Sequence, residues 1–212
     1  MAFPDLADLR YRVRTLLNET TAALWTDACL NRLIDDANKD SAIKGTCIVN
    51  TDTISTVASS RFIPFMGYLV TAVEYLPTTG SKKGLIKITP NMVGHVLLNG
   101  VVPQYWYQWG KQIGIEPVPT TTYNLSVSII DFPAGEMTSD TDEPEVPASF
   151  QTILTYYAVY KALIRTGKYA TSAAVYKEYL HSLSEARKSY IDTIPDGYYD
   201  FHVPSQTLQK GV

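Results

Sequence analysis

Apolar residues recur at helical spacing in the first part of the chain. The stretch from Pro4 to Asn18 predicts one helix. A second apolar stripe follows Thr26, which is a good N-cap residue, and Gly45 is expected to end that helix. The two stripes consist of Leu6, Leu9, Val13, Leu16 and Leu17, and of Leu30, Leu33, Ile34, Ala37 and Ile43. The N-terminal segment is therefore predicted to be a pair of helices.

The period changes between Thr46 and Pro133, where β-branched and aromatic runs alternate with Pro and Gly. Strands are expected at residues 46–57, 61–65, 68–76, 85–89, 104–109, 112–116 and 123–132. One short helix is expected within residues 90–99. Crossover helices for a parallel sheet are missing, so the pattern favours an antiparallel sandwich or small barrel.

Helical spacing returns after a polar, acidic loop at residues 134–147, whose composition is not expected to bury a core. One helix is predicted from Ala148 to Thr166, ended by Gly167. A second helix is predicted from the next apolar seam. The seam consists of Tyr169, Ala173, Tyr176, Leu180, Leu183 and Tyr190, and Arg187 is its one exception. The short break indicates an antiparallel helical hairpin.

The last segment, residues 195–212, has no helical period but carries five large apolar side chains: Tyr198, Tyr199, Phe201, Val203 and Leu208. Such a segment is either disordered or an arm ordered by a partner, and its aromatic residues favour the arm. The predicted fold class is α+β. Residues 1–45 and 148–194 form a helical bundle, residues 46–133 an inserted β domain, residues 134–147 an acidic loop and residues 195–212 a docking arm.

Composition points to protein partners rather than nucleic acid. Charged residues make up 18% of the chain, below the roughly 25% usual for soluble domains, and there are 15 Tyr. Tyr is enriched at protein interfaces, so self-association is expected. The balance of 18 Lys and Arg against 21 Asp and Glu disfavours binding to nucleic acid by phosphate neutralisation.

Signatures of catalysis, cofactor binding and metal binding are missing. Gly110 and Gly114 flank Lys111 without phosphate-loop spacing and are interpreted as turn glycines, and the three His are far apart in the sequence. His95 is interpreted as a structural histidine; pairing it with Asp131 and a Ser as a triad has no motif behind it. We therefore expect no catalytic residue, cofactor or metal site.

Three further features support a reduced, soluble chain. Cys29 and Cys47 lie in apolar contexts and are interpreted as buried free thiols. The acidic cluster within residues 140–145 lacks the glycine and terminal glutamate of a calcium loop and is interpreted as solvated. Neither a signal peptide nor an apolar stretch of membrane-spanning length is seen, so the chain is expected to stay in the cytoplasm, with no membrane partner.

The densest aromatic run is a predicted strand that contains Tyr105, Trp106, Tyr107 and Trp109. Strand alternation would place Trp106 on one face and the other three rings on the opposite face. Three interpretations remain open: a strand with one face in the core and aromatic pairs on the other, an interface with another subunit or a tail protein, or a platform that stacks on sugar rings.

Several segments together resemble the head-to-tail adaptor, or connector, proteins of tailed bacteriophages. In the N-terminal part the similar residues are Trp25-Thr26-Asp27 leading into 30–37. In the β region they are 102–106, 110–119, 123–127 and Phe132-Pro133, which resemble the inserted β domain of the longer adaptors. In the C-terminal helices they are Val146-Pro147, 155–158, Tyr176 and Tyr179.

The resemblance implies a non-enzymatic virion protein, assembled in the host cytoplasm. It forms a ring, usually dodecameric, under the portal protein and extends the DNA channel to a tail or nozzle protein. DNA passes through without sequence-specific binding. The helical bundle forms the ring, the β insertion faces outward or toward the tail, and the C-terminal extension lies against the portal. Tyr198, Tyr199, Phe201, Val203 and Leu208 are then the expected portal anchors. The alternative is a surface- or carbohydrate-binding virion module that uses the aromatic strand.

Overall fold

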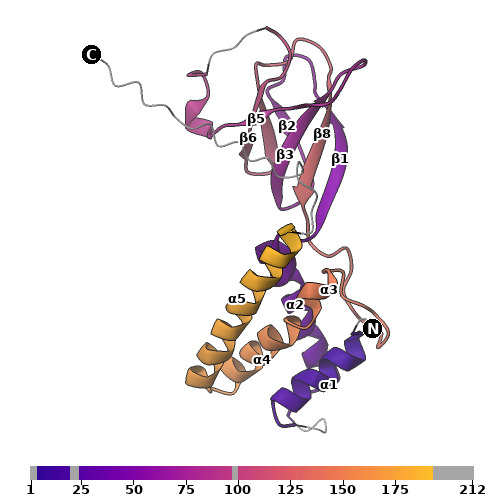
Figure 1. Ribbon diagram of the computed structural model, residues 1–212, viewed down its shortest axis with the longest axis vertical. Coiled ribbons are helices and arrows are strands. Elements are labelled where there is room, and N and C mark those ends of the chain that lie inside the picture. Colours follow the sequence, from indigo (N-terminus) through magenta and orange to yellow (C-terminus); the bar gives the residue numbers. More distant parts are fainter. Residues whose placement is uncertain (1–3, 20–23, 97–99, 193–212) are drawn as a thin grey trace, which may run out of the picture.

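The computed structural model of the chain describes residues 4–19, 24–96 and 100–192 and shows two lobes. In Figure 1 the helices gather in one lobe and the strands in the other. We call these the helical lobe and the β lobe. The chain enters the β lobe once, after the second helix, and returns once, before the third. The predicted α+β class is confirmed.

The two N-terminal helices begin at side-chain caps. Helix α1 spans Leu6–Leu16, and the Asp5 carboxylate accepts a hydrogen bond from the Asp8 N–H at 2.8 Å. Helix α2 spans Asp27–Gly45 and is capped by Thr26, as predicted. Thr46, at φ +52°, turns the chain out of α2 directly after Gly45. Local capping chemistry thus sets three of the four helix ends.

The C-terminal helices are α3 (Ala148–Gln151), α4 (Leu154–Arg165) and α5 (Tyr169–Asp192). The sequence predicts one helix over 148–166, but the structure interrupts it at Thr152 and Ile153. The Gln151 amide donates to the carbonyls of Pro144 and Val146, which ties α3 to the preceding loop instead of to the axis of α4. Gly167, at φ +74°, makes the predicted turn into α5.

Helix α5 packs with only part of the predicted seam. Tyr169 and Leu180, both in that seam, are 68% and 41% exposed. Of the seam, Leu183 is buried and Tyr176 and Tyr190 are half-buried against the core, and the other buried positions of α5 are Ser172, Tyr179 and Ala186. The prediction was wrong for Tyr169 and Leu180 because apolar residues occupy two neighbouring sides of this helix, and spacing alone does not tell which side is covered.

The core of the helical lobe includes part of the acidic loop. Met137 and Val146 from that loop are 6% and 1% exposed and belong to this core, contrary to the prediction. The carbonyls of Asp142 and Asp140 accept hydrogen bonds from the first N–H groups of α1, at 2.9 and 3.1 Å. Backbone N–H donors of Thr138 and Ser139 hold the Asp142 carboxylate and lower its pKa. The loop is therefore a fixed part of the helical lobe.

The β lobe contains two four-stranded sheets, with orders β1-β8-β3-β4 and β2-β7-β6-β5. The strands are β1 (Val49–Ser55), β2 (Phe62–Pro64), β3 (Leu69–Leu76), β4 (Lys83–Gly84), β5 (Ile86–Lys87), β6 (Tyr105–Trp109), β7 (Gln112–Glu116) and β8 (Asn124–Ile130). The short helix expected within 90–99 is a 3-10 turn, η1 (Pro90–Met92). All pairs are antiparallel except β5 with β6, whose long connection allows a parallel arrangement.

Side chains from both sheets share one core. Val70, Val73, Leu125, Val127 and Ile129 come from β3 and β8, and Ile63, Trp106, Ile113 and Ile115 come from β2, β6 and β7. No residue of this cluster belongs to the helical core. The lobes therefore have separate cores.

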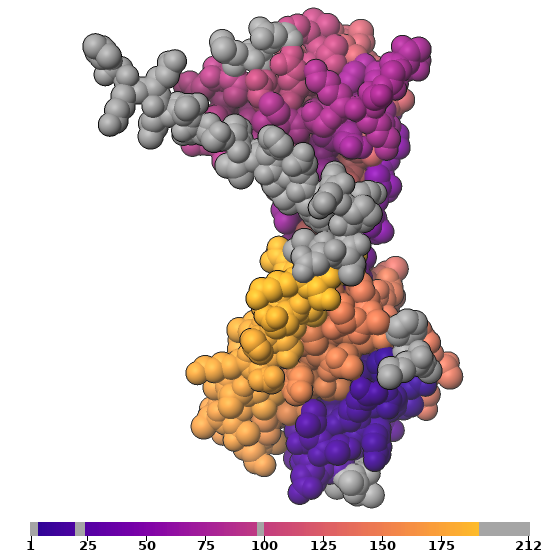
Figure 2. All heavy atoms as spheres, in the orientation of Figure 1, coloured from indigo at the N-terminus to yellow at the C-terminus, as the bar shows by residue number. Residues whose placement is uncertain are grey.

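The two chain crossings between the lobes lie side by side. Val49, at the start of β1, is paired with Ile130, at the end of β8, and the Asp131 N–H donates to the Ile48 carbonyl at 3.1 Å. Cys47 is already part of the helical core. Figure 2 shows the molecule narrowing at this junction.

Candidate interaction surfaces

The described residues show no constellation for catalysis or metal binding. Among residues 4–19, 24–96 and 100–192, no group of three or more His, Cys, Asp or Glu is arranged to hold a metal ion. His95 is exposed rather than packed in a core, and the Asp131 carboxylate accepts from the N–H of its neighbour Phe132 at 2.8 Å. In the same ranges, none of the helices has the length and apolar character needed to cross a bilayer.

The two cysteines differ in environment. Cys47 is 3% exposed, and burial raises the pKa of its thiol to about 12. Cys29 is only half-buried, and its sulfur accepts a hydrogen bond from Arg165 Nη1 at 3.0 Å. Both are free thiols, and the expectation of full burial is correct only for Cys47.

Two of the four rings in the aromatic strand are buried inside the chain. Trp106 is 1% exposed within the β-lobe core, and the Lys87 ammonium lies 4.9 Å from its ring centroid. Tyr107 is 3% exposed because its ring covers Gly114 on β7 and meets the ring of Phe62 edge-on at 6.2 Å. Neither side chain offers surface to a partner.

Gly114 has a role different from the predicted one. It lies inside β7 opposite Tyr107, and a Cβ at this position would be 2.1 Å from Tyr107 Cζ. Gly110, at φ +59°, does form the turn between β6 and β7. The glycine at 114 is thus required by close side-chain packing rather than by a turn.

Three exposed aromatic rings, those of Trp109, Tyr68 and Phe132, lie at the end of the β lobe nearest the junction. Trp109, at the end of β6 on this side, is 61% exposed, whereas Tyr105, at the other end of the strand, is half-buried. The rings of Tyr68 and Phe132, 46% and 43% exposed, meet edge-on at 5.7 Å. Gln108 ties β6 to this region, since its side chain accepts from the Val70 N–H at 3.0 Å. An interface at the aromatic strand stays a prediction. Of the four rings in this strand, only Tyr105 and Trp109 are accessible enough to take part in it.

Tyrosines of the helical lobe form a contiguous cluster on α4 and α5. Tyr160 stacks on Tyr176 at 4.5 Å, and Tyr157 meets Tyr179 at 5.2 Å. The Tyr179 hydroxyl donates to Asp40 Oδ2 at 2.6 Å, and burial raises the pKa of this phenol. Much of the tyrosine excess therefore holds the helices together, while the outer rings of the cluster are half-buried.

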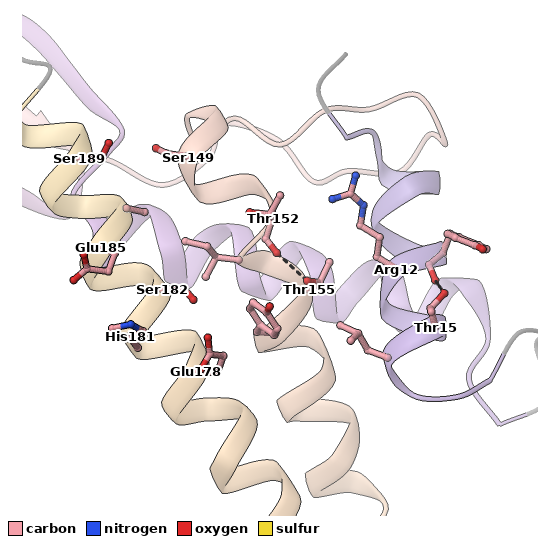
Figure 3. A pocket seen from close by; sticks show the side chains of 15 residues that line it. Arg12, Thr15, Ser149, Thr152, Thr155, Glu178, His181, Ser182, Glu185 and Ser189 are labelled. Carbon is pink, nitrogen blue, oxygen red and sulfur yellow. Dashed lines mark hydrogen bonds between the residues drawn. The ribbon is translucent and has the colours of Figure 1, made fainter. Parts of the chain in front are cut away.

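A groove of about 840 Å³ runs along the helical lobe between α1 and α5. Its floor is formed by α3, by the break at Thr152 and Ile153, and by the start of α4 with Tyr156. Figure 3 shows Arg12 and Thr15 on the α1 wall and Glu178, His181 and Glu185 on the α5 wall. The groove exists because α1 and α5 both pack on α4 without filling the space between them.

The groove has apolar rims and charged walls. Tyr11 and Leu16 of α1 are 69% and 53% exposed. Arg12 is paired with Asp8 at 2.7 Å, and Glu185 is paired with Lys188 at 2.7 Å, which lowers the pKa of the Glu185 carboxyl. Sequence analysis missed this groove, although the apolar Leu16 near the end of the first predicted helix was a partial signal.

The expected portal anchors, Tyr198, Tyr199, Phe201, Val203 and Leu208, lie outside the described residues. Helix α5 ends at Asp192, on the side of the helical lobe that faces the junction. The anchors therefore stay a prediction.

The chain matches the model of a known protein family. A family model described as SU10 adaptor protein matches residues 4–198, which include every helix and strand of the structure. The chain has no match among curated proteins. The match confirms the resemblance to phage adaptors and places the chain among structural virion proteins rather than in an enzyme class. The chain belongs to the SU10 adaptor protein family and is a bacteriophage head-to-tail adaptor.

Proposed function

We propose that this adaptor forms a closed ring under the portal, dodecameric by analogy with related adaptors, that extends the DNA channel and joins capsid to tail. The observation that carries the proposal is the family match over residues 4–198. Adaptors of this kind interact with portal and tail components. The net charge of −3 suits a channel in which DNA slides without sequence-specific binding.

The two lobes are assigned different tasks. Residues 1–45 and 148–194 act as the ring-forming helical bundle, and residues 46–133 act as an inserted sandwich that faces outward or toward a tail or nozzle protein. The separate cores support this division, because each lobe can keep its shape while the other contacts a partner. The acidic loop at 134–147 belongs with the bundle, to whose core it contributes.

The segment at 195–212 acts as the arm that docks on the portal, anchored by Tyr198, Tyr199, Phe201, Val203 and Leu208. The sequence supports this role, since three aromatic side chains within four residues have little use in a solvating tail. An arm that orders only on its partner delays docking until the portal is present.

The test is assembly with purified portal, followed by native mass measurement and cosedimentation. The full chain is expected to add a ring of copies to the portal. A chain without residues 196–212 is expected to keep its circular dichroism spectrum but to lose cosedimentation. A full-length variant with the five anchors changed to Ser controls for the shorter chain. It is also expected to lose cosedimentation with the portal. Unchanged binding of both variants contradicts the arm, and absence of binding by the full chain contradicts the ring.

The carbohydrate-binding alternative is less well supported. Sugar stacking needs exposed aromatic faces. Trp106 and Tyr107 are buried, and only Trp109 of the aromatic strand is well exposed. We therefore prefer a protein interface at this end of the β lobe.

A further inference from the structure

Helix α5 carries an exposed stripe on the flank away from the groove. The stripe consists of Tyr169, Ala173, Lys177, Leu180 and Arg187, all exposed and spaced to lie on one side of a helix. It contains three of the six apolar residues of the predicted seam, namely Tyr169, Ala173 and Leu180. A stripe of this kind left uncovered in the monomer indicates a surface that another protein covers.

The opposite flank of the same helix forms one wall of the groove. That wall carries Glu178 and Glu185, whereas the stripe carries Lys177 and Arg187. Between the two flanks lies the buried face with Tyr179 and Leu183. One copy of the chain thus presents a cationic ridge with apolar side chains on one side, and on the other a groove with an apolar rim and an acidic α5 wall.

We propose that the stripe of one copy docks in the groove of the next copy around the ring. This inference rests on the proposed ring and names the surfaces that build it. Tyr169 and Leu180 would lie against the exposed Leu16 and the floor of the groove. Lys177 and Arg187 would face Glu178 and Glu185, and charge complementarity therefore selects a second copy as the occupant.

The residue spacing fits rotational symmetry. In a ring whose axis runs along α5, equal residue numbers of neighbouring copies lie at equal heights. Lys177 is then level with Glu178, and Arg187 is two residues, or about 3 Å of helix rise, from Glu185. A long Arg side chain spans that offset.

The contact is of the kind that closes rings. Stripe and groove are different surfaces, so a two-fold dimer does not satisfy both, and each docked copy leaves one free stripe and one free groove. Successive docking of copies then gives a closed ring if the rotation that relates each copy to the next adds up to a full turn.

Reciprocal charge reversal tests the proposal. The groove variant carries Glu178→Lys and Glu185→Lys, and the stripe variant carries Lys177→Glu and Arg187→Glu. Each is mixed with portal, and the ring is measured by native mass. Each variant alone is expected to stay folded, because all four positions are exposed, and to lose the ring. The control, Lys82→Glu with Lys83→Glu on the β lobe, is expected to assemble normally.

An equimolar mixture of the two variants is expected to restore the ring. Copies then alternate, with a reversed groove facing a reversed stripe and an original groove facing an original stripe. If each variant assembles like the unmodified chain, the docking is wrong while the ring stands. If both fail and the mixture also fails, the pairing is wrong. Normal assembly of the stripe variant alone, with failure of the groove variant, assigns the groove to an occupant other than α5 and overturns the proposal. Failure of the unmodified chain to assemble overturns the ring itself.

Discussion

The helical lobe and the β lobe are assembled from the chain in opposite ways. The β lobe uses one continuous stretch from Val49 to Ile130, whereas the helical lobe joins α1 and α2 to helices that follow the whole β lobe in the sequence. Helices α1 and α2 both pack on α4, and this packing joins segments that are far apart in the sequence. The helical lobe therefore depends on contacts that reach across the whole β lobe in the sequence, whereas the strand pairs of the β lobe, β1 with β8 included, lie within residues 49–130.

The lobes also differ in what they bury. The helical lobe buries Arg14, which donates to the Trp25 carbonyl at 2.8 Å and to Asp27 Oδ1 at 2.6 Å and lies 3.6 Å from Glu19. The hydrogen bond from Arg14 to Asp27 Oδ1 lowers the pKa of the Asp27 carboxyl. The clustered core residues of the β lobe are apolar. This lobe also buries Glu116, whose carboxylate is paired with Arg61 at 2.9 Å. The comparison teaches that specific polar contacts position the helices, while strand register positions the sheets.

The largest expected effect tests whether the two cores unfold separately. Phe150→Ala in the helical core and Trp106→Ala in the β-lobe core each remove a fully buried ring, at a cost of about 3–5 kcal/mol. Each change is expected to lower the midpoint of one transition in calorimetry and to leave the other in place. If either change shifts both transitions equally, the lobes form one cooperative unit.

A smaller effect tests the close packing that is particular to the β lobe. Gly114→Ala places a methyl group against Tyr107 and is expected to lower the free energy of unfolding by about 1–3 kcal/mol, measured in urea. Gly84→Ala, with no atom within 4 Å of the added methyl group, is the matched control and is expected to change little.

The same prediction can be examined with a second substitution. In Tyr107→Ala the ring is gone, so adding Gly114→Ala is expected to cost no further stability. A cost that persists in the double variant would show that the strain comes from the backbone rather than from the ring.

The smallest expected effect concerns the pH dependence of the helical lobe. Burial raises the pKa of the Cys47 thiol from its ordinary value of 9.0 to about 12 in the folded protein. The raised pKa means that stability is fully present below pH 9 and is lost as pH rises toward 12, because the unfolded thiol ionises first. Between pH 8 and pH 10 the unmodified chain is expected to lose about 1 kcal/mol more than Cys47→Ala. Equal losses would show that the thiol ionises freely in the folded protein.

Elements that depend on neighbouring residues were predictable from the sequence. Strand β7 has the predicted bounds, and Thr26 and Gly45 mark the predicted ends of α2. Alternation, breakers and capping residues act within a few positions, so one sequence is enough to locate them. The adaptor family was also predictable, since its similar segments span both lobes.

Features that depend on packing between distant segments were not predictable. The sequence does not tell that Tyr107 covers Gly114, that Met137 enters the helical core, or that the seam at Tyr169 and Leu180 faces outward. The groove was missed for the same reason, because its lining residues come from α1, α3, α4 and α5 and are largely polar. The portal anchors stay a prediction from composition and position.

The pairing of Val49 with Ile130 makes the β lobe a natural cassette for protein engineering. Paired antiparallel residues have Cα atoms only about 5 Å apart, so the helical lobe presents two adjacent attachment points whatever is placed between them. A short turn, or any foreign domain with neighbouring ends, fits the same gap without displacing a helix.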